Sequence, residues 1–279
     1  MPADKAPHAA GFACNTYSYT MSHGARDCLS HLAGMGFREV ELMMYPGHLW
    51  PPDTGAQERR ELGRHVGALG LHVVTLNMPN IDMNIAGASA EMRRHTLDLL
   101  RGIVELAGDL GVPGVVLGPG KANTLFAAPT ERLTGYLFAA LDELGPLSSK
   151  AGTALWVENI PFAFLPEAEQ LTAVLDRYGN PDIGIVWDAA NSHFMGEDLG
   201  TSLRLCAPRL KLVHLSDTNR WRYRHDSVGL GTVPFAELPP LLAEVGYVRR
   251  SMLEIIAPDA DKDILASAER LAAMGLAQA

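Results

Sequence analysis

Short apolar runs alternate with amphipathic runs along the whole chain, and this alternation most limits what the chain can fold into. Each apolar run has the length of a buried strand, and a loop and a helical pattern follow it. Strict alternation of this kind favours a parallel sheet covered by helices. The predicted strands are Gly11–Thr16, Glu39–Met44, His72–Asn77, Gly114–Leu117, Ala154–Glu158, Ile183–Asp188, Leu210–His214 and Ser251–Ile256.

The runs between these strands show helical periodicity, and several of them end at a glycine. Gly70, Gly111 and Gly179 follow the last periodic residue, where a left-handed C-cap glycine commonly stands. Gly145 and Gly246 repeat the pattern, so we expect helices to end there as well. The predicted helices are Arg26–Ala33, Gln57–Leu69, Ala90–Leu110, Glu131–Leu144, Glu167–Tyr178, Leu199–Leu205, Phe235–Val245 and Ile264–Met274.

Eight strand–helix units in 279 residues predict a (β/α)8 TIM barrel that occupies residues 1–279 as a single domain. The alternative is an open, doubly wound sheet, which normally has a glycine-rich phosphate-binding turn after its first strand. Residues 15–20, Asn-Thr-Tyr-Ser-Tyr-Thr, contain no such turn. The sequence therefore favours the closed barrel.

Charge and composition exclude several classes of protein. The formal net charge is −9, and the one local basic concentration is Arg220, Arg222 and Arg224, which argues against a nucleic-acid partner. Three scattered cysteines do not form a disulfide framework. No apolar run approaches the roughly 20 residues that span a membrane, and the first ten residues lack a signal core. We expect a cytoplasmic protein with no membrane partner.

Four consecutive predicted strands end on residue types that bind metals. These residues are Glu158, Asp188, His214 and Glu254. The carboxyl ends of barrel strands face the active site, so we expect the four side chains to converge. Because side chains alternate along a strand, the residues two positions earlier also point inward, one layer below. Those residues are all apolar, as a packed interior requires: Trp156, Val186, Leu212 and Met252.

Three carboxylates and one imidazole predict a site for one divalent metal ion. Carboxylates favour hard ions such as Mn²⁺ and Mg²⁺, and imidazole extends the choice to Zn²⁺, Fe²⁺ and Co²⁺. Mn²⁺ is the first choice. Substrate oxygens would fill the coordination positions that the protein leaves open.

With these ligands the chain resembles the sugar isomerase/epimerase superfamily, which has a xylose-isomerase-like barrel. That group includes ketose 3-epimerases, hydroxypyruvate isomerase, inosose and 3-dehydroshikimate dehydratases and an apurinic-site endonuclease branch. The resemblance implies that Glu158 and Glu254 bind the metal and also move protons as an acid/base pair. It places a substrate-binding arginine at Arg220, and it implies a homodimer or a homotetramer.

The sequence departs from this superfamily at two places. Asn191 stands where many members carry a histidine, and an amide cannot titrate. The endonuclease branch has an Asp-x-His pair in the loop after strand seven, and here that stretch reads Tyr223-Arg-His225. The aspartate is missing, which argues against a multi-zinc nuclease.

Further side chains are candidates for contact with the substrate. Lys121 lies in a glycine-rich stretch after the fourth strand, Glu41 ends the second strand, and Trp50 lies in the long loop that follows it. The complete predicted substrate-binding set is Arg220, Asn191, His225, Lys121, Glu41 and Trp50. Trp187 precedes Asp188 and should face outward, beneath a helix.

The predicted function is a metal-dependent isomerase or epimerase of a small sugar, ketose or sugar derivative. A divalent ion would polarise a carbonyl and a neighbouring hydroxyl, and removal of the intervening proton would give an enediolate. Dehydration begins with the same step, so a dehydratase of the 3-dehydroshikimate or inosose type is the alternative. An endonuclease and an inactive sugar-binding protein are less favoured.

Overall fold

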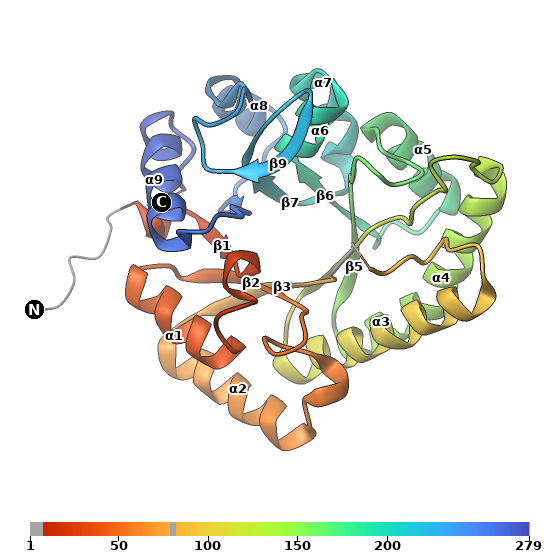
Figure 1. Ribbon diagram of the computed structural model, residues 1–279, viewed down its shortest axis with the longest axis horizontal. Coiled ribbons are helices and arrows are strands. Elements are labelled where there is room, and N and C mark those ends of the chain that lie inside the picture. Colours follow the sequence, from red (N-terminus) through yellow and green to blue (C-terminus); the bar gives the residue numbers. More distant parts are fainter. Residues whose placement is uncertain (1–7, 79–81, 279) are drawn as a thin grey trace, which may run out of the picture.

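The computed structural model describes residues 8–78 and 82–278, and a closed barrel of parallel strands lies at its centre (Figure 1). The strands follow one another around the barrel in the order β1-β10-β7-β6-β5-β4-β3-β2. This confirms the predicted TIM barrel. The barrel strands are β1 Ala13–Asn15, β2 Glu39–Met43, β3 His72–Asn77, β4 Gly114–Leu117, β5 Ala154–Glu158, β6 Gly184–Asp188, β7 Leu210–Leu215 and β10 Met252–Leu253.

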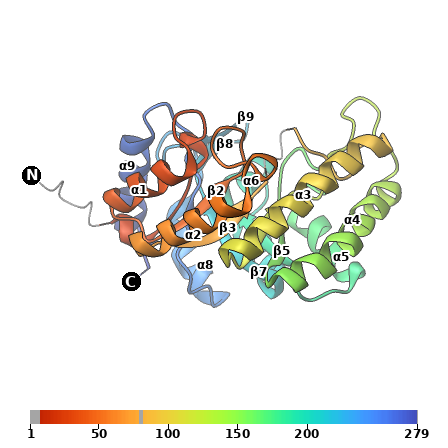
Figure 2. The ribbon, with the colours of Figure 1, turned by 90° about the horizontal axis from the view of Figure 1, so that it is seen from below.

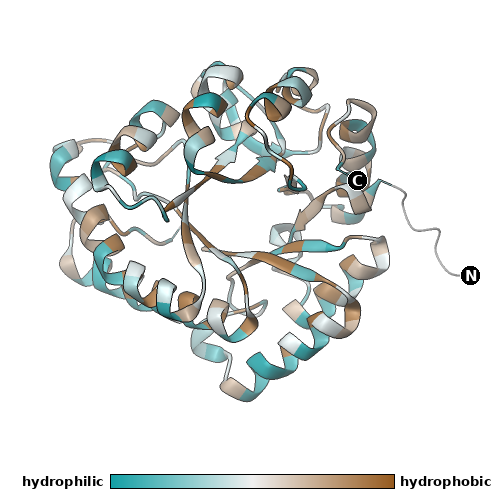
Figure 3. Ribbon diagram, turned by 180° about the vertical axis from the view of Figure 1, so that it is seen from behind, coloured by the Kyte–Doolittle hydropathy of each residue, from teal (hydrophilic) through white to brown (hydrophobic). Residues whose placement is uncertain are grey.

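Helices form an outer ring around the strands, with neighbours such as α3 and α4 side by side in both views (Figures 1 and 2). In Figure 3 the strands are largely hydrophobic, while hydrophilic residues lie along the outer faces of the helices. The α-helices are α1 Ala25–Met35, α2 Ala56–Leu69, α3 Ala90–Leu110, α4 Thr130–Ala151, α5 Ala168–Tyr178, α6 Ala189–Met195, α7 Leu199–Cys206, α8 Leu238–Glu244 and α9 Ala260–Ala273. Among the described residues, no helix is both long and apolar enough to cross a bilayer.

Helix α4 does not end where the sequence pattern predicts. It continues through Gly145 and Pro146 to Ala151, and Gly152 is the left-handed residue that caps it. Leu144 and Ser148 are buried on its inner face. Packing of that face against the barrel therefore overrides the local stop signals, because tertiary contacts outweigh intrinsic helix propensity.

One helix and one two-stranded hairpin at the barrel rim were absent from the sequence prediction. Helix α6 begins directly after β6, with Asp188 as its N-cap: the Asp188 carboxylate accepts a hydrogen bond from the Asn191 backbone N–H. A hairpin of β8 Asp217–Asn219 and β9 Arg222–Asp226 follows β7, where the sequence suggested a loop. Both elements lie immediately beyond strand ends, so they build the rim of the barrel.

The lower interior of the barrel is a separate apolar layer. Its members are Ala13, Val74, Val116, Trp156, Val186, Leu212 and Met252. The inward orientation predicted for Trp156 and the three residues level with it is thereby confirmed. Trp156 fits because glycines stand beside it: a Cβ at Gly114 would lie 2.8 Å from the indole, and one at Gly184 would lie 2.7 Å away.

Trp187 faces the other way, as predicted. It is fully buried in the outer core, and its indole N–H donates a hydrogen bond to Ser202 Oγ at 2.8 Å. Inner and outer residues thus alternate along β6, and Asp188 emerges above the apolar layer on the inner side.

Candidate metal centre

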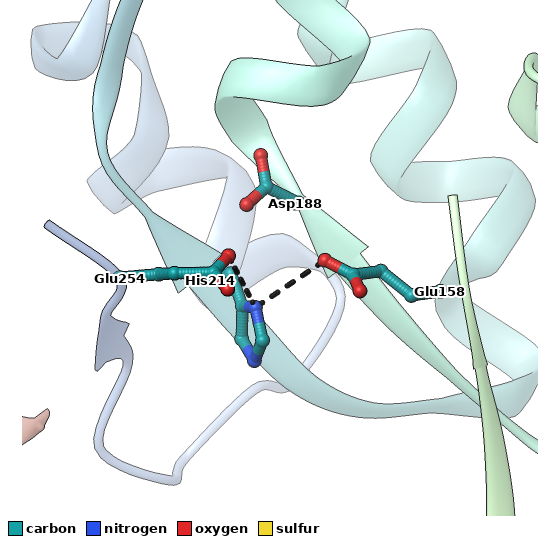
Figure 4. A group of neighbouring side chains, drawn as sticks. All are labelled: Glu158, Asp188, His214 and Glu254. Atoms are coloured by element: carbon teal, nitrogen blue, oxygen red, sulfur yellow. Dashed lines mark hydrogen bonds and ion pairs between the residues drawn. The ribbon is translucent and has the colours of Figure 1, made fainter. Parts of the chain in front are cut away.

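Glu158, Asp188, His214 and Glu254 meet in one group above the apolar layer (Figure 4). Each offers a ligand atom, and these atoms all lie within 4.8 Å of one another. Glu158 and Asp188 end β5 and β6, His214 lies near the end of β7, and Glu254 directly follows β10. All four side chains are buried. The closed barrel therefore brings together residues that are up to 96 positions apart, as the numbering of Glu158 and Glu254 shows.

His214 lies beneath the three carboxylates and presents its Nδ1 to two of them. That nitrogen is 3.1 Å from Glu254 Oε2 and 3.4 Å from Glu158 Oε1. Burial disfavours a charged ring, yet the Glu41 and Glu254 carboxylates raise the pKa of His214 well above its usual range. The carboxylates around the ring therefore favour its protonated form.

Asp188 has one satisfied and one unsatisfied carboxylate oxygen. Its Oδ1 accepts the hydrogen bond from Asn191 N at 2.6 Å. Its Oδ2 is buried and has no hydrogen-bond partner among the described residues. Burial and the charges of Glu254 and Glu158 raise the pKa of Asp188 well above its usual range.

The two glutamates have opposite pKa shifts. Burial, reinforced by the charge of Glu254, raises the pKa of Glu158 to about 7. Burial also disfavours the charged form of Glu254, but His225 and His214 outweigh it and lower the pKa of that carboxylate. Two carboxyl groups in one site therefore differ in their readiness to hold a proton.

A divalent cation fits this set of donors. Three carboxylates repel one another in a buried site, and an unpartnered oxygen on Asp188 is costly unless a cation or donor reaches it. Oxygen ligands with one imidazole suit Mn²⁺, Mg²⁺, Zn²⁺, Fe²⁺ or Co²⁺. The residues present therefore match the kind of ion that the sequence predicts.

A pocket of about 370 Å³ opens directly above Glu158 and Glu254. Three of the predicted substrate-binding residues line it: Asn191, His225 and Lys121. Asn191 Oδ1 is buried without a hydrogen-bond partner in the described part of the chain, so it can accept a hydrogen bond from a ligand. The pocket is large enough for a small ligand next to the four converging side chains.

His225 connects the pocket wall to the metal-binding group. Its Nδ1 lies 2.9 Å from Ser216 Oγ and 3.4 Å from Glu254 Oε2, and its Nε2 lies 2.8 Å from Tyr223 Oη. Burial lowers the pKa of His225, although Glu254 acts in the opposite direction. The ring is therefore fixed at both nitrogens.

The other three predicted substrate-binding residues lie elsewhere. Arg220 is exposed at the turn of the β8–β9 hairpin and does not line the pocket. Trp50 lines a separate surface pocket together with His48. Glu41 is fully buried in the barrel, next to His214. The sequence predicted substrate contact for these three residues but did not indicate where their side chains point.

Several pocket residues were not among the sequence candidates. Tyr17, Phe162, Tyr223 and Arg224 line the pocket, and Phe162 and Tyr223 form an edge-to-face pair with ring centroids 5.2 Å apart. Tyr223 and His225 are two positions apart in a polar segment, and this spacing was the available sequence signal for strand β9. Phe162 lies in the loop after β5, and the sequence gives no signal for its position.

The comparison with protein families decides where this barrel belongs. Residues 29–274 match the family model described as xylose isomerase-like TIM barrel. The chain belongs to this family. The match covers all four residues of the candidate metal centre, and the family assignment agrees with the resemblance inferred from them.

Individual relatives are distant. An uncharacterized protein of Methanocaldococcus jannaschii is 24% identical over 181 residues, which is 62% of this chain and 61% of that protein. The chain thus spans less than two thirds of that relative's length. Fructoselysine 3-epimerase of Shigella flexneri is 20% identical over 250 residues, or 88% of each protein.

Solved structures share the fold over almost the whole chain. A D-tagatose 3-epimerase-like protein superposes with a TM-score of 0.81 and 19% identity, covering 94% of this chain and 96% of its own. The IolI protein, crystallised with a zinc atom, has a TM-score of 0.76 and 18% identity, with coverage of 94% and 96%. At these identities the likeness establishes the architecture alone.

Proposed function

We propose that this protein is a divalent-metal-dependent epimerase or isomerase of a small sugar, ketose or sugar derivative. The observation that carries the proposal is the convergence of Glu158, Asp188, His214 and Glu254 within 4.8 Å at the floor of a pocket. The named epimerases among the relatives, at low identity, support the same class of reaction. Mn²⁺ is the proposed ion, and the zinc in the IolI structure supports a divalent metal in general.

Glu158, Asp188, His214 and Glu254 would hold the ion. When bound, it supplies Lewis acidity toward a substrate carbonyl and the hydroxyl beside it. The unpartnered oxygen of Asp188 supports its place in this set. Asn191 and Lys121 lie on the pocket wall, where an amide and an ammonium group can hydrogen-bond to further substrate oxygens.

Glu158 and Glu254 are the proposed acid/base pair. Both line the pocket, and they come from β5 and from the end of β10, which β6 and β7 separate in the barrel. One carboxylate takes the proton from the carbon next to the carbonyl, and the resulting enediolate of the substrate accepts a proton from the other. Return of the proton to the opposite face of the same carbon gives an epimer, whereas return to the neighbouring carbon gives an isomer.

The pocket wall also suits a carbohydrate. Phe162 and Tyr223 line the pocket, and Phe194 packs against both of them, with centroid distances of 5.2 to 6.0 Å within the group. Aromatic rings offer flat apolar faces, while the acidic floor binds oxygen-rich groups through the ion. This combination supports a small molecule with both hydroxyl groups and C–H faces.

Proton exchange in D₂O tests the proposal. The protein is incubated with Mn²⁺ and a panel of ketoses, and loss of the C–H signal next to the carbonyl is followed by ¹H NMR. We expect exchange and a new epimer or isomer with at least one ketose, and neither after chelation nor with Asp188→Asn. Absence of exchange with every ketose would contradict the proposal, as would an enone absorbance, which would mark a dehydratase.

A further inference from the structure

Glu41 is a buried carboxylate with an unusual number of donors around it. It lies on β2, at the edge of the His214 ring opposite to Glu158 and Glu254, and its exposed fraction is 0%. Thr75 Oγ1 donates to its Oε2 at 2.6 Å, and Asn77 Nδ2 donates to its Oε1 at 3.1 Å. Asn15 Nδ2 also donates to Oε1. Such a set of donors fixes the position of a charged group in an apolar surrounding.

The position of Thr75 depends on an irregularity between β2 and β3. The register shifts between Val40 and Glu41, so that Val40 pairs with Val73 but Glu41 pairs with Thr75. The extra residue on β3, Val74, lies in the apolar layer, and Thr75 then stands opposite Glu41. A bulge of this kind re-aims a side chain, and here it supplies a hydroxyl donor to the carboxylate.

The remaining neighbour of Glu41 is the imidazole of His214. Its Nε2 lies 3.4 Å from Glu41 Oε1 and has no hydrogen-bond partner among the described residues. Its Nδ1 is on the opposite edge of the ring, beside Glu158 and Glu254. The two nitrogens therefore face two different carboxylate environments.

A metal-binding imidazole must offer a lone pair on one nitrogen, so its proton must reside on the other. Nδ1 faces the other ligands, which leaves Nε2 as the protonated nitrogen. Glu41 is the carboxylate placed to accept that N–H. Carboxylates in this position fix the ring orientation and make the histidine a stronger ligand.

We propose that Glu41 is a positioning residue that orients His214 and strengthens the metal site, rather than a contact for the substrate. Asn15 extends this link, because its Nδ2 also lies 3.4 Å from Glu254 Oε1 while its Oδ1 accepts from Tyr17 N at 2.6 Å. The buried residues of β1, β2 and β3 thus support ligands supplied by β7 and by the segment after β10. This inference rests on the proposed metal site.

The test is the affinity of the full-length, metal-free protein for Mn²⁺, measured by calorimetry or by competition with a chelator. Glu41→Gln keeps the shape of the side chain and removes its charge, and we expect a dissociation constant about 10- to 100-fold higher. Thr75→Val removes one donor to Glu41 and should weaken binding in the same direction but less. Unfolding of each metal-free variant is measured in parallel.

Glu39→Gln is the matched control. Glu39 lies on the same strand and pairs with Arg250 at 2.7 Å, away from the four ligands, so its replacement should leave the Mn²⁺ affinity unchanged. Lower stability of Glu41→Gln with wild-type affinity would overturn the positioning role and leave the metal site intact. Absence of Mn²⁺ binding by the wild type would overturn the proposed function together with this inference. If Glu41→Gln does not fold, the test depends on Thr75→Val. A wild-type Mn²⁺ affinity in that variant would overturn the positioning role of Glu41.

Discussion

Glu41 and Asp188 are both buried carboxylates in the upper layer of the barrel, but their surroundings differ. Both oxygens of Glu41, on the side formed by β1 to β3, accept hydrogen bonds from neutral side chains. Asp188, on the side formed by β5 to β7 and β10, has an oxygen with no hydrogen-bond partner among the described residues and lies beside two further carboxylates. The carboxylate on one side of the barrel is fully hydrogen-bonded by protein side chains, and the carboxylate on the other side is not.

This difference indicates where a ligand binds. A buried charge that is fully hydrogen-bonded gains little from an added ion, whereas clustered charges without partners are stabilised by a cation. Among these carboxylates, Glu158 and Glu254 line the pocket, whereas Glu41 does not. We call the side formed by β5 to β7 and β10 the binding side, and the side formed by β1 to β3 the supporting side. The following experiments test whether the two sides differ in this way.

The largest expected effect is on catalysis by the binding side. Glu158→Gln and Glu254→Gln each remove a proposed proton-transfer group, so we expect kcat to fall by about 10²- to 10⁴-fold. Steady-state kinetics with the ketose identified by proton exchange measure this loss. Glu169→Gln, on the exposed face of α5, is the control and should retain wild-type kcat. Near-normal turnover by either pocket variant with metal bound would refute the paired assignment.

Metal binding at the binding side should stabilise the folded protein. With free Mn²⁺ at 100 times its dissociation constant, the free energy of unfolding should rise by about 2.7 kcal/mol. Asp188→Asn should lose most of this increment. In the absence of metal, the variant should be no less stable than the wild type, because a repelling charge is removed and asparagine can still cap α6. Urea denaturation with and without Mn²⁺ measures both quantities. An undiminished increment in Asp188→Asn would exclude that residue as a ligand.

Packing beneath the binding side should be intolerant of added volume. A Cβ at Gly184 would meet the Lys211 side chain at 2.3 Å and the Trp156 ring at 2.7 Å, so Gly184→Ala should destabilise the fold by about 1–3 kcal/mol. Gly145→Ala is the matched control, since Gly145 stands inside α4 and a Cβ there would meet no neighbouring atom within 4 Å. That variant should be stabilised by about 0.5–1 kcal/mol. Equal unfolding free energies for the two variants would contradict the tight packing of Trp156.

The smallest expected effect is a pH dependence on the supporting side. His48 is buried and hydrogen-bonded to His23 O and Thr16 Oγ1, and burial lowers its pKa below the usual 6.5. As the pH falls below 6.5, the unfolded chain binds a proton at His48 before the folded chain does, so stability decreases. One such group contributes a slope of at most about 1.4 kcal/mol per pH unit. His48→Gln should flatten the stability profile between pH 6.5 and 5, and an unchanged slope would show that other groups cause it.

The sequence was sufficient for the architecture and for the four converging residues. Alternation of short apolar runs with helical patterns is a local property of the chain, and it predicted eight strands that correspond to the eight barrel strands. The last one is shorter than predicted, because β10 ends at Leu253 rather than at Ile256. The period of two along β5 and β6 also predicted that Trp156 and Val186 lie below Glu158 and Asp188. The family match over residues 29–274 supports the same conclusion independently.

The sequence was not sufficient for the roles of individual polar side chains. Glu41 and Glu254 both lie on predicted strands, yet one is buried among donors and the other borders the pocket. Arg220 and Arg224 belong to one basic stretch, yet only Arg224 lines the pocket, because the β8–β9 hairpin directs it there. Neither difference is encoded in the nearest neighbours along the chain.

Periodicity over a few residues is therefore enough to predict the repeating pattern, the barrel and the residue types at its upper edge. Which other polar side chains support or border the four converging residues depends on contacts between distant strands. Closure of the barrel brings Asn15 next to Glu254, 239 positions away, and a register shift places Thr75 opposite Glu41. Such contacts form only when distant strands meet, so local sequence patterns carry no record of them.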